Sequence, residues 1–205
     1  MTAILAKKLG MTQRFLDDGR VERVTVLEAG PCPVTAIRTL DRDGYEAVQL
    51  AFGACKEKAI TKAELGHLKK ADTSAHRHVV EFRDEAGELL VGETVTADAF
   101  EVGQRVKISG TSKGKGFQGT IRRHNFKSGP KSHGSHNVRA PGSIGASATP
   151  SRVFKGIRGP GRMGGGRITQ RGLTVVEIMP AQNLLLVRGA VPGPKGGTVE
   201  VRTDG

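Results

Sequence analysis

The chain has 205 residues and a formal net charge of +12, and its charges are divided unevenly along the sequence. Residues 1–110 contain 16 Lys or Arg against 17 Asp or Glu, residues 111–171 contain 13 against none, and residues 172–205 contain 3 against 3. No run of 18 apolar residues is present, which excludes a transmembrane helix, and two cysteines are too few for a disulfide-stabilised fold. The amino terminus lacks the basic-then-apolar order of a secretory signal, so we expect a cytoplasmic protein.

The first 110 residues have the pattern of short β-strands separated by turns. Turn signals rich in Asp, Glu and Gly are found at 17–19, 41–44 and 85–87. Short strands at this spacing favour a closed barrel or a sandwich over alternating β-α units. The five predicted strands, all rich in β-branched residues, are 21–27 (VERVTVL), 34–40 (VTAIRTL), 45–52 (YEAVQLAF), 78–83 (HVVEFR) and 105–108 (RVKI).

One helix is predicted to interrupt these strands. Thr61 and Glu64 have the spacing of a capping box, in which each side chain bonds a free backbone amide at the start of a helix. The helix is expected to end before Ala71. The expected fold class is therefore mainly β, with a small helical insertion.

Strand signals return after residue 171, at 173–179 (LTVVEIM), 183–187 (NLLLV) and 198–202 (TVEVR). Because three strands cannot form a stable core alone, we expect them to complete the sheet begun by the first 110 residues. The predicted organisation is a β-barrel domain formed by 1–110 and 172–205, with 111–171 inserted as a long basic, largely irregular extension. A fully extended hairpin of this length would reach at most ~80–100 Å from the barrel.

The basic segment 111–171 contains 13 of the 29 glycines but only 9 Leu, Ile, Val or Phe residues. Such a segment cannot offset its ordering entropy by burying apolar surface, so we expect it to be disordered without a polyanionic partner. A solvated linker is the alternative, but 13 positive charges without one acid favour nucleic acid. With no Trp, one Tyr and seven Phe in the chain, contacts to the nucleic-acid backbone are favoured over base stacking as the main mode.

The candidate nucleic-acid contacts are the cations and histidines of this segment. A His-x-x-His pair can ligate zinc, but the segment offers no Cys, Asp or Glu as further ligands, so no metal is expected. Glycine-rich stretches at 110–115 and 159–164 lack the spacing and context of nucleotide-binding loops. We therefore expect no cofactor, no catalytic residue and no small-molecule substrate. The candidate contacts are Lys113, Lys115, Arg122, Arg123, His124, Lys127, Lys131, His133, His136, Arg139, Arg152, Lys155, Arg158, Arg162, Arg167 and Arg171.

The middle of the basic segment is different, because residues 140–151 carry no charge and most of them are small. Small uncharged side chains suit a tip that passes through a narrow space. A disordered turn explains the same composition equally well.

Three stretches resemble the bacterial members of the large-subunit ribosomal protein L-three family. They are GTSKGKGFQGTIRRHNF (110–126), RAPGSIGASATPSRVFKG (139–156) and NLLLVRGAVPG (183–193), and AKKLGMTQRF (6–15) agrees as well. The resemblance runs from end to end of the chain.

This resemblance implies a β-barrel of the translation-factor type and an extension directed toward the peptidyl transferase centre of the large (50S) subunit. It also implies direct binding to 23S ribosomal RNA near its 3′ end, a role in early subunit assembly, and contacts with large-subunit proteins fourteen and nineteen. Lys113, Lys115, Arg122, Arg123 and Lys127 match the family's basic neck. The tip of the extension is matched by Gly145, Ala146, Ser147, Ala148 and Thr149.

One position departs from the family pattern. Relatives carry a glutamine, methylated on its side-chain amide, where this chain has Ala148. Because alanine has no amide nitrogen, that modification cannot occur here.

Two other classes of protein remain as alternatives at this stage. A basic architectural nucleic-acid-binding protein would also use a glycine-rich cationic arm, although it would not require a neutral tip. An enzyme of the barrel domain is the third class, but its acidic residues are scattered among turns with no convergent set.

Overall fold

The computed structural model describes residues 2–16, 19–83 and 89–204, which belong to two compact units. Met1–Ser112 and Arg167–Gly205 form the barrel unit, and Lys113–Gly166 form the extension unit. The extension unit is narrower than the expected segment 111–171, because residues 167–171 belong to a barrel strand. The turns predicted at 17–19 and 85–87 lie wholly or partly outside the described residues, whereas the 41–44 turn coincides with the short helix α1 (Leu40–Asp43).

Six strands close into a barrel in the order β1-β12-β7-β10-β11-β2, and all neighbours in the barrel are antiparallel. Three of these strands precede the extension unit and three follow it, so the carboxyl-terminal strands complete the barrel as predicted. The mainly β fold class is confirmed. The barrel strands are β1 (Ala3–Phe15), β2 (Val21–Ala29), β7 (Arg105–Thr111), β10 (Arg167–Met179), β11 (Leu184–Arg188) and β12 (Thr198–Thr203).

The barrel core follows from the two-residue period of its strands. Val106 and Ile108 on β7, and Val199 and Val201 on β12, are buried at alternate positions, because successive side chains of a strand point to opposite faces. Closure of the barrel pairs the edges that an open sheet would leave exposed. This rigid barrel holds both ends of the extension unit, through β7 on one side and β10 on the other.

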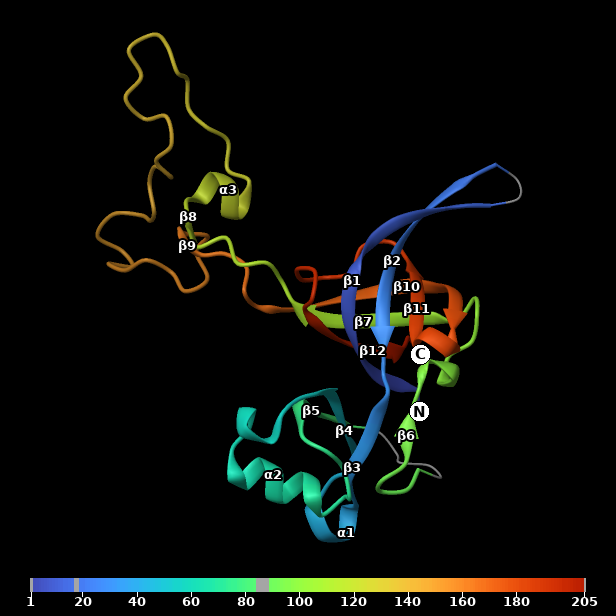
Figure 1. The fold of residues 1–205 in the computed structure, drawn as a ribbon. Helices are drawn as coiled ribbons and strands as arrows, with labels where there is room; N and C mark the ends of the chain where they lie inside the picture. The colour runs from blue at the N-terminus through green and yellow to red at the C-terminus, as the bar shows by residue number, and fades with distance from the viewer. Residues whose placement is uncertain (1, 17–18, 84–88, 205) are drawn as a thin grey trace. The chain divides into compact units, whose positions relative to one another are not determined.

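Strands β1 and β2 continue beyond the barrel as a two-stranded ribbon, which Figure 1 shows in blue. The first residues of β1 are buried, whereas Leu9, Met11 and Phe15 are exposed, as is Val21 on β2. The sequence analysis did not predict β1. Four consecutive buried positions followed by an exposed stretch do not give the alternation by which strands are recognised.

A second sheet in the barrel unit has the strand order β5-β4-β3-β6. Three strands predicted from the sequence, at 34–40, 45–52 and 78–83, form this sheet and not the barrel, which corrects the expectation of a single sheet. The predicted helix is present as α2 (Lys62–Lys69), and both hydrogen bonds of the Thr61–Glu64 capping box are formed. The strands are β3 (Cys32–Arg38), β4 (Ala47–Ala54), β5 (His76–Phe82) and β6 (Thr94–Val95), and short 3-10 turns occupy Glu57–Ala59, Ala97–Ala99 and Pro180–Gln182.

The extension unit is largely irregular, as predicted, but it is ordered at its base. Strands β8 (Phe117–Gln118) and β9 (Gly161–Arg162) pair there, and the short helix α3 (Thr120–His124) follows β8. Figure 1 shows the remaining chain of this unit as a long irregular loop. Backbone hydrogen bonds join the two legs at this base. Disorder of the unit without a polyanionic partner stays a prediction, because the unit has little apolar surface.

Candidate nucleic-acid interface

All charged side chains of the extension unit are positively charged. Residues 113–166 contain eleven Lys or Arg and no Asp or Glu. Ten of these eleven cations are exposed, and within the described part of the chain none of the eleven takes part in an ion pair. Unpaired cations concentrated on one unit attract a polyanion.

Backbone hydrogen bonds hold the two legs of the extension unit together at its base. The Lys115 amide donates to the Met163 carbonyl at 2.9 Å, and the Met163 amide donates to the Gly116 carbonyl at 2.9 Å. Gly164, with φ of 71°, lies so close to the opposite leg that a Cβ there would be 2.1 Å from the Lys113 carbonyl oxygen. Only glycine therefore allows this close pairing, which we call the base clamp (residues 113–118 and 161–164).

Two predicted contacts, Arg123 and His124, are turned inward and bond the opposite leg. Arg123 Nη1 donates to the Gly159 carbonyl at 2.8 Å, and His124 Nε2 lies 3.0 Å from the same oxygen. A Cβ at Gly161 would be 2.8 Å from Arg123 Nη1, so a larger residue there would displace the guanidinium. Both side chains are half-buried, and they position α3 against the second leg.

The other predicted contacts within the extension unit project into solvent. They are spread along both legs, so the unit presents charge on each side of its neutral tip. Side-chain carboxylates are absent from this unit, so no acidic group within it competes with phosphate for these cations. The exposed residues are Lys113, Lys115, Arg122, Lys127, Lys131, His133, His136, Arg139, Arg152, Lys155, Arg158 and Arg162.

The two last predicted contacts, Arg167 and Arg171, lie on barrel strand β10 and have acidic partners. Arg167 pairs with Glu200, and Arg171 Nε and Nη2 donate to Asp204 Oδ1 at 3.0 and 2.8 Å. The bond from Arg171 and a further bond from the Gly172 amide lower the pKa of the Asp204 carboxyl below its usual value. These two arginines are therefore partly neutralised within the barrel unit.

The neutral tip is exposed from Gly145 to Thr149. Two flanking serines bond the backbone of the tip: Ser143 Oγ donates to the Gly145 carbonyl at 3.0 Å, and Ser151 Oγ donates to the Ala148 carbonyl. The tip itself consists of small, uncharged residues. Such a surface is suited to close packing against another macromolecule.

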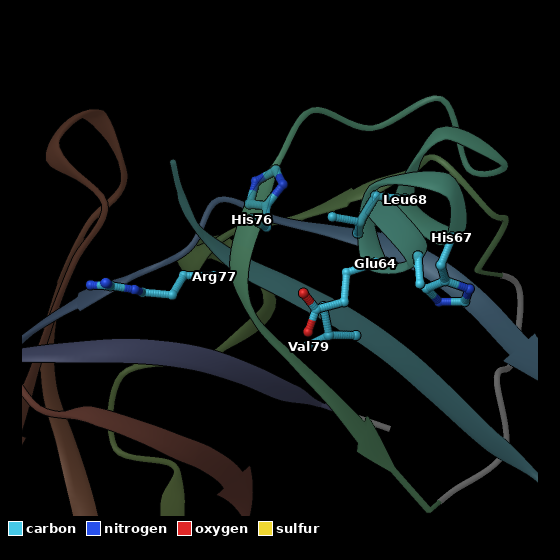
Figure 2. Close-up of a pocket in the computed structure, with 7 residues that line it drawn as sticks. Glu64, His67, Leu68, His76, Arg77 and Val79 are labelled. Atoms are coloured by element: carbon cyan, nitrogen blue, oxygen red, sulfur yellow. The ribbon is translucent and has the colours of Figure 1, made fainter. Parts of the chain in front are cut away.

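A recess between α2 and β5 in the barrel unit is lined by titratable side chains, among them Glu64, His67 and His76 (Figure 2). Glu64 accepts bonds from the Thr61 amide and hydroxyl, both at 2.9 Å, and these bonds lower the pKa of its carboxyl. His67 Nε2 bonds the side-chain oxygen of Gln49. Figure 2 shows Arg77 pointing away from Glu64. Glu64 and His67 are thus engaged in holding the helix, and the recess offers no convergent acid and base.

His133 and His136 are not joined by further ligands, and the described residues contain no cluster of three or more His, Cys, Asp or Glu side chains that could hold a metal ion. Among the described residues, no helix is long and apolar enough to cross a membrane. Gly159 and Met163, whose backbone atoms organise the base, were not predicted as site residues. Their stretch, 159–164, was noted only as an incomplete nucleotide-binding motif, because neither residue has a polar side chain.

Fold and charge together define a β-barrel protein with an inserted, purely cationic extension. The profile of the family described as Ribosomal protein L3 matches residues 48–183. The large ribosomal subunit protein uL3 of Acidothermus cellulolyticus is 54% identical over 202 residues, which are 98% of this chain and 91% of that protein. The proteins of the same name from Streptomyces coelicolor and Acaryochloris marina are 54% and 50% identical, over 98% and 97% of this chain and 94% of each relative.

The chain therefore belongs to the ribosomal protein L3 family. The match covers most of the chain and both units, since residues 48–183 include the whole extension unit.

Proposed function

We propose that the protein is a structural constituent of the large ribosomal subunit in the cytoplasm, and that it binds 23S ribosomal RNA through its extension unit. The relatives are named as large-subunit proteins, which supports the assembly. The observation that carries the RNA contact is a unit with eleven cations, no acid and an ordered base. Membership in a ribosomal protein family makes the protein a structural component and not an enzyme.

The exposed cations of the extension unit are the proposed phosphate contacts. Arg123 and His124 are proposed as positioning residues, because their bonds to Gly159 fix the direction of α3. Arg167 and Arg171 contribute less to RNA binding, because Glu200 and Asp204 already neutralise part of their charge. RNA binding is thus concentrated in residues 113–166.

The finer role follows the family resemblance. The protein binds near the 3′ end of 23S ribosomal RNA, acts early in assembly, and contacts large-subunit proteins fourteen and nineteen. Its tip, Gly145 to Thr149, points toward the peptidyl transferase centre. The small exposed residues of the tip support this placement, because long or charged side chains would not pack in a narrow RNA passage.

Titration of the full-length protein against 23S ribosomal RNA and against duplex DNA of equal charge tests the proposal. We expect tighter binding to the ribosomal RNA at every salt concentration, with a steep dependence of log affinity on log salt. Equal affinity for both polyanions would favour a general architectural nucleic-acid-binding protein. Weak, salt-independent binding to both nucleic acids would show that the extension unit is not the RNA contact.

A further inference from the structure

Phe117 is a large apolar side chain that the protein leaves uncovered. Its side chain is 75% exposed, although it lies on a paired strand. The phenylalanines of the barrel unit at positions 52, 82 and 100 are buried. Phe117 is thus far more exposed than these three core phenylalanines.

The base clamp fixes the position of Phe117. Phe117 is paired with Arg162 in the β8–β9 ladder, and the Lys115–Met163 bonds extend this pairing on one side. On the other side α3 begins at Thr120, which is buried. Because the backbone of residue 117 is held between two ordered elements, binding has to order only the side chain.

The surroundings of Phe117 select a ligand with a flat apolar face and a negative charge. Residues directly opposite in an antiparallel pair have side chains on the same face, so the exposed Arg162 side chain lies on the same face of the ladder as the ring. A nucleotide combines an aromatic base with a phosphate, and base stacking on aromatic side chains is the usual way proteins bind unpaired RNA.

Two other exposed phenylalanines lack this combination. Phe154 lies in an irregular stretch, and the guanidinium of Arg152 stands over its ring at 5.9 Å from the centroid. Phe15 is 69% exposed on the β1–β2 ribbon, in the unit whose acids and bases nearly balance. Phe15 is consequently a matched control for exposure without the cationic surroundings.

We infer that Phe117 is a stacking platform for an unpaired base of the ribosomal RNA, with Arg162 holding an adjoining phosphate. This inference rests on the proposed function and adds a contact to the bases, which the cations alone do not supply. The contact is apolar and therefore independent of salt. It is thereby distinguished from the phosphate contacts of the neighbouring lysines and arginines.

The test compares full-length Phe117→Leu, Phe117→Tyr and Phe15→Leu proteins with the wild type, binding naked 23S ribosomal RNA across a range of salt concentrations. Leucine keeps apolar bulk but removes the aromatic face, whereas tyrosine keeps it. We expect Phe117→Leu to bind roughly tenfold more weakly at every salt concentration, with an unchanged slope of log affinity against log salt. Phe117→Tyr and Phe15→Leu should bind within about twofold of the wild type, because each keeps the stack.

The outcomes separate this inference from the proposed function. If Phe117→Leu binds the RNA as tightly as the wild type does, and wild-type binding falls steeply with salt, the stacking contact is overturned. The proposed function would still stand in that case. A Phe117→Leu protein that binds naked RNA normally but fails to enter assembled subunits would identify a protein partner at Phe117, which also overturns the inference. A changed salt slope, or equal losses for leucine and tyrosine, would mean that the ring only supports the clamp. No binding by the wild type would refute the proposed function itself.

Discussion

Substitution Gly164→Ala tests whether the base clamp is what orders the extension unit. An added Cβ would lie 2.1 Å from the Lys113 carbonyl oxygen, and the φ of 71° is unfavourable for alanine. A left-handed conformation costs a residue other than glycine roughly 1–2 kcal/mol, and relief of the overlap requires the legs to separate. The two Lys115–Met163–Gly116 backbone bonds contribute about 1 kcal/mol each, so the strain is sufficient to open the clamp.

Amide hydrogen exchange on the full-length protein measures this opening directly. We expect the Lys115 and Met163 amides to lose protection by about 10- to 100-fold in Gly164→Ala, since each 1.4 kcal/mol is a factor of ten. Gly114→Ala is the matched control, because a Cβ there meets no atom within 4 Å. Protection of both amides at the wild-type level in Gly164→Ala would refute the account of the clamp.

Four further predictions concern the interface, the tip and the barrel. Arg122→Ala and Lys127→Ala should each reduce the slope of log affinity against log salt by about one unit in titrations with 23S ribosomal RNA, and an unchanged slope would place those side chains in solvent. Glu81 has a lowered pKa because hydrogen bonds from Tyr45 and Arg38 outweigh the opposing effect of burial. The stability that Glu81 contributes is therefore present above its pKa in the unfolded chain and is lost as the pH falls through its pKa in the folded protein. Denaturant unfolding should consequently show that Glu81→Gln loses less stability than the wild type between neutral and acid pH. Ala148→Trp should impair peptide transfer by assembled subunits without changing the thermal midpoint of the free protein, whereas Ala148→Gln should be tolerated; normal transfer by a fully incorporated Ala148→Trp protein would contradict the placement of the tip. Ile108→Ala should lower the free energy of unfolding by about 2–5 kcal/mol, because Ile108 is fully buried in the barrel, and a smaller loss in chemical denaturation would indicate a core that collapses around the cavity.

Local patterns predicted the parts of the fold that local interactions determine. The capping box at Thr61 and the β-branched runs identified α2 and most barrel strands, because capping and two-residue alternation need only neighbouring residues. Assignment of the 45–52 strand to the second sheet was not predictable. It depends on pairing of β4 with β3 and β5, which the amino-acid pattern of a strand does not specify.

The candidate interface was predictable in its charge but not in its internal contacts. The thirteen cations from Lys113 to Arg171, with no acid among them, indicated a polyanion partner, since charge is visible in composition alone. The inward roles of Arg123 and His124 were not visible, because their shared acceptor, the Gly159 carbonyl, lies 35–36 residues along the chain. Every residue has a backbone carbonyl, so the amino-acid sequence does not reveal which carbonyl accepts a hydrogen bond.

The most direct test of the central claim is ultraviolet crosslinking of the assembled large subunit, followed by mass spectrometry of the peptides joined to ribosomal RNA. We expect most crosslinked peptides to come from Lys113–Gly166, with their RNA partners near the 3′ end of the 23S molecule or at the peptidyl transferase centre. Crosslinks confined to peptides of the barrel unit, with those of the extension unit recovered free of RNA, would contradict the account.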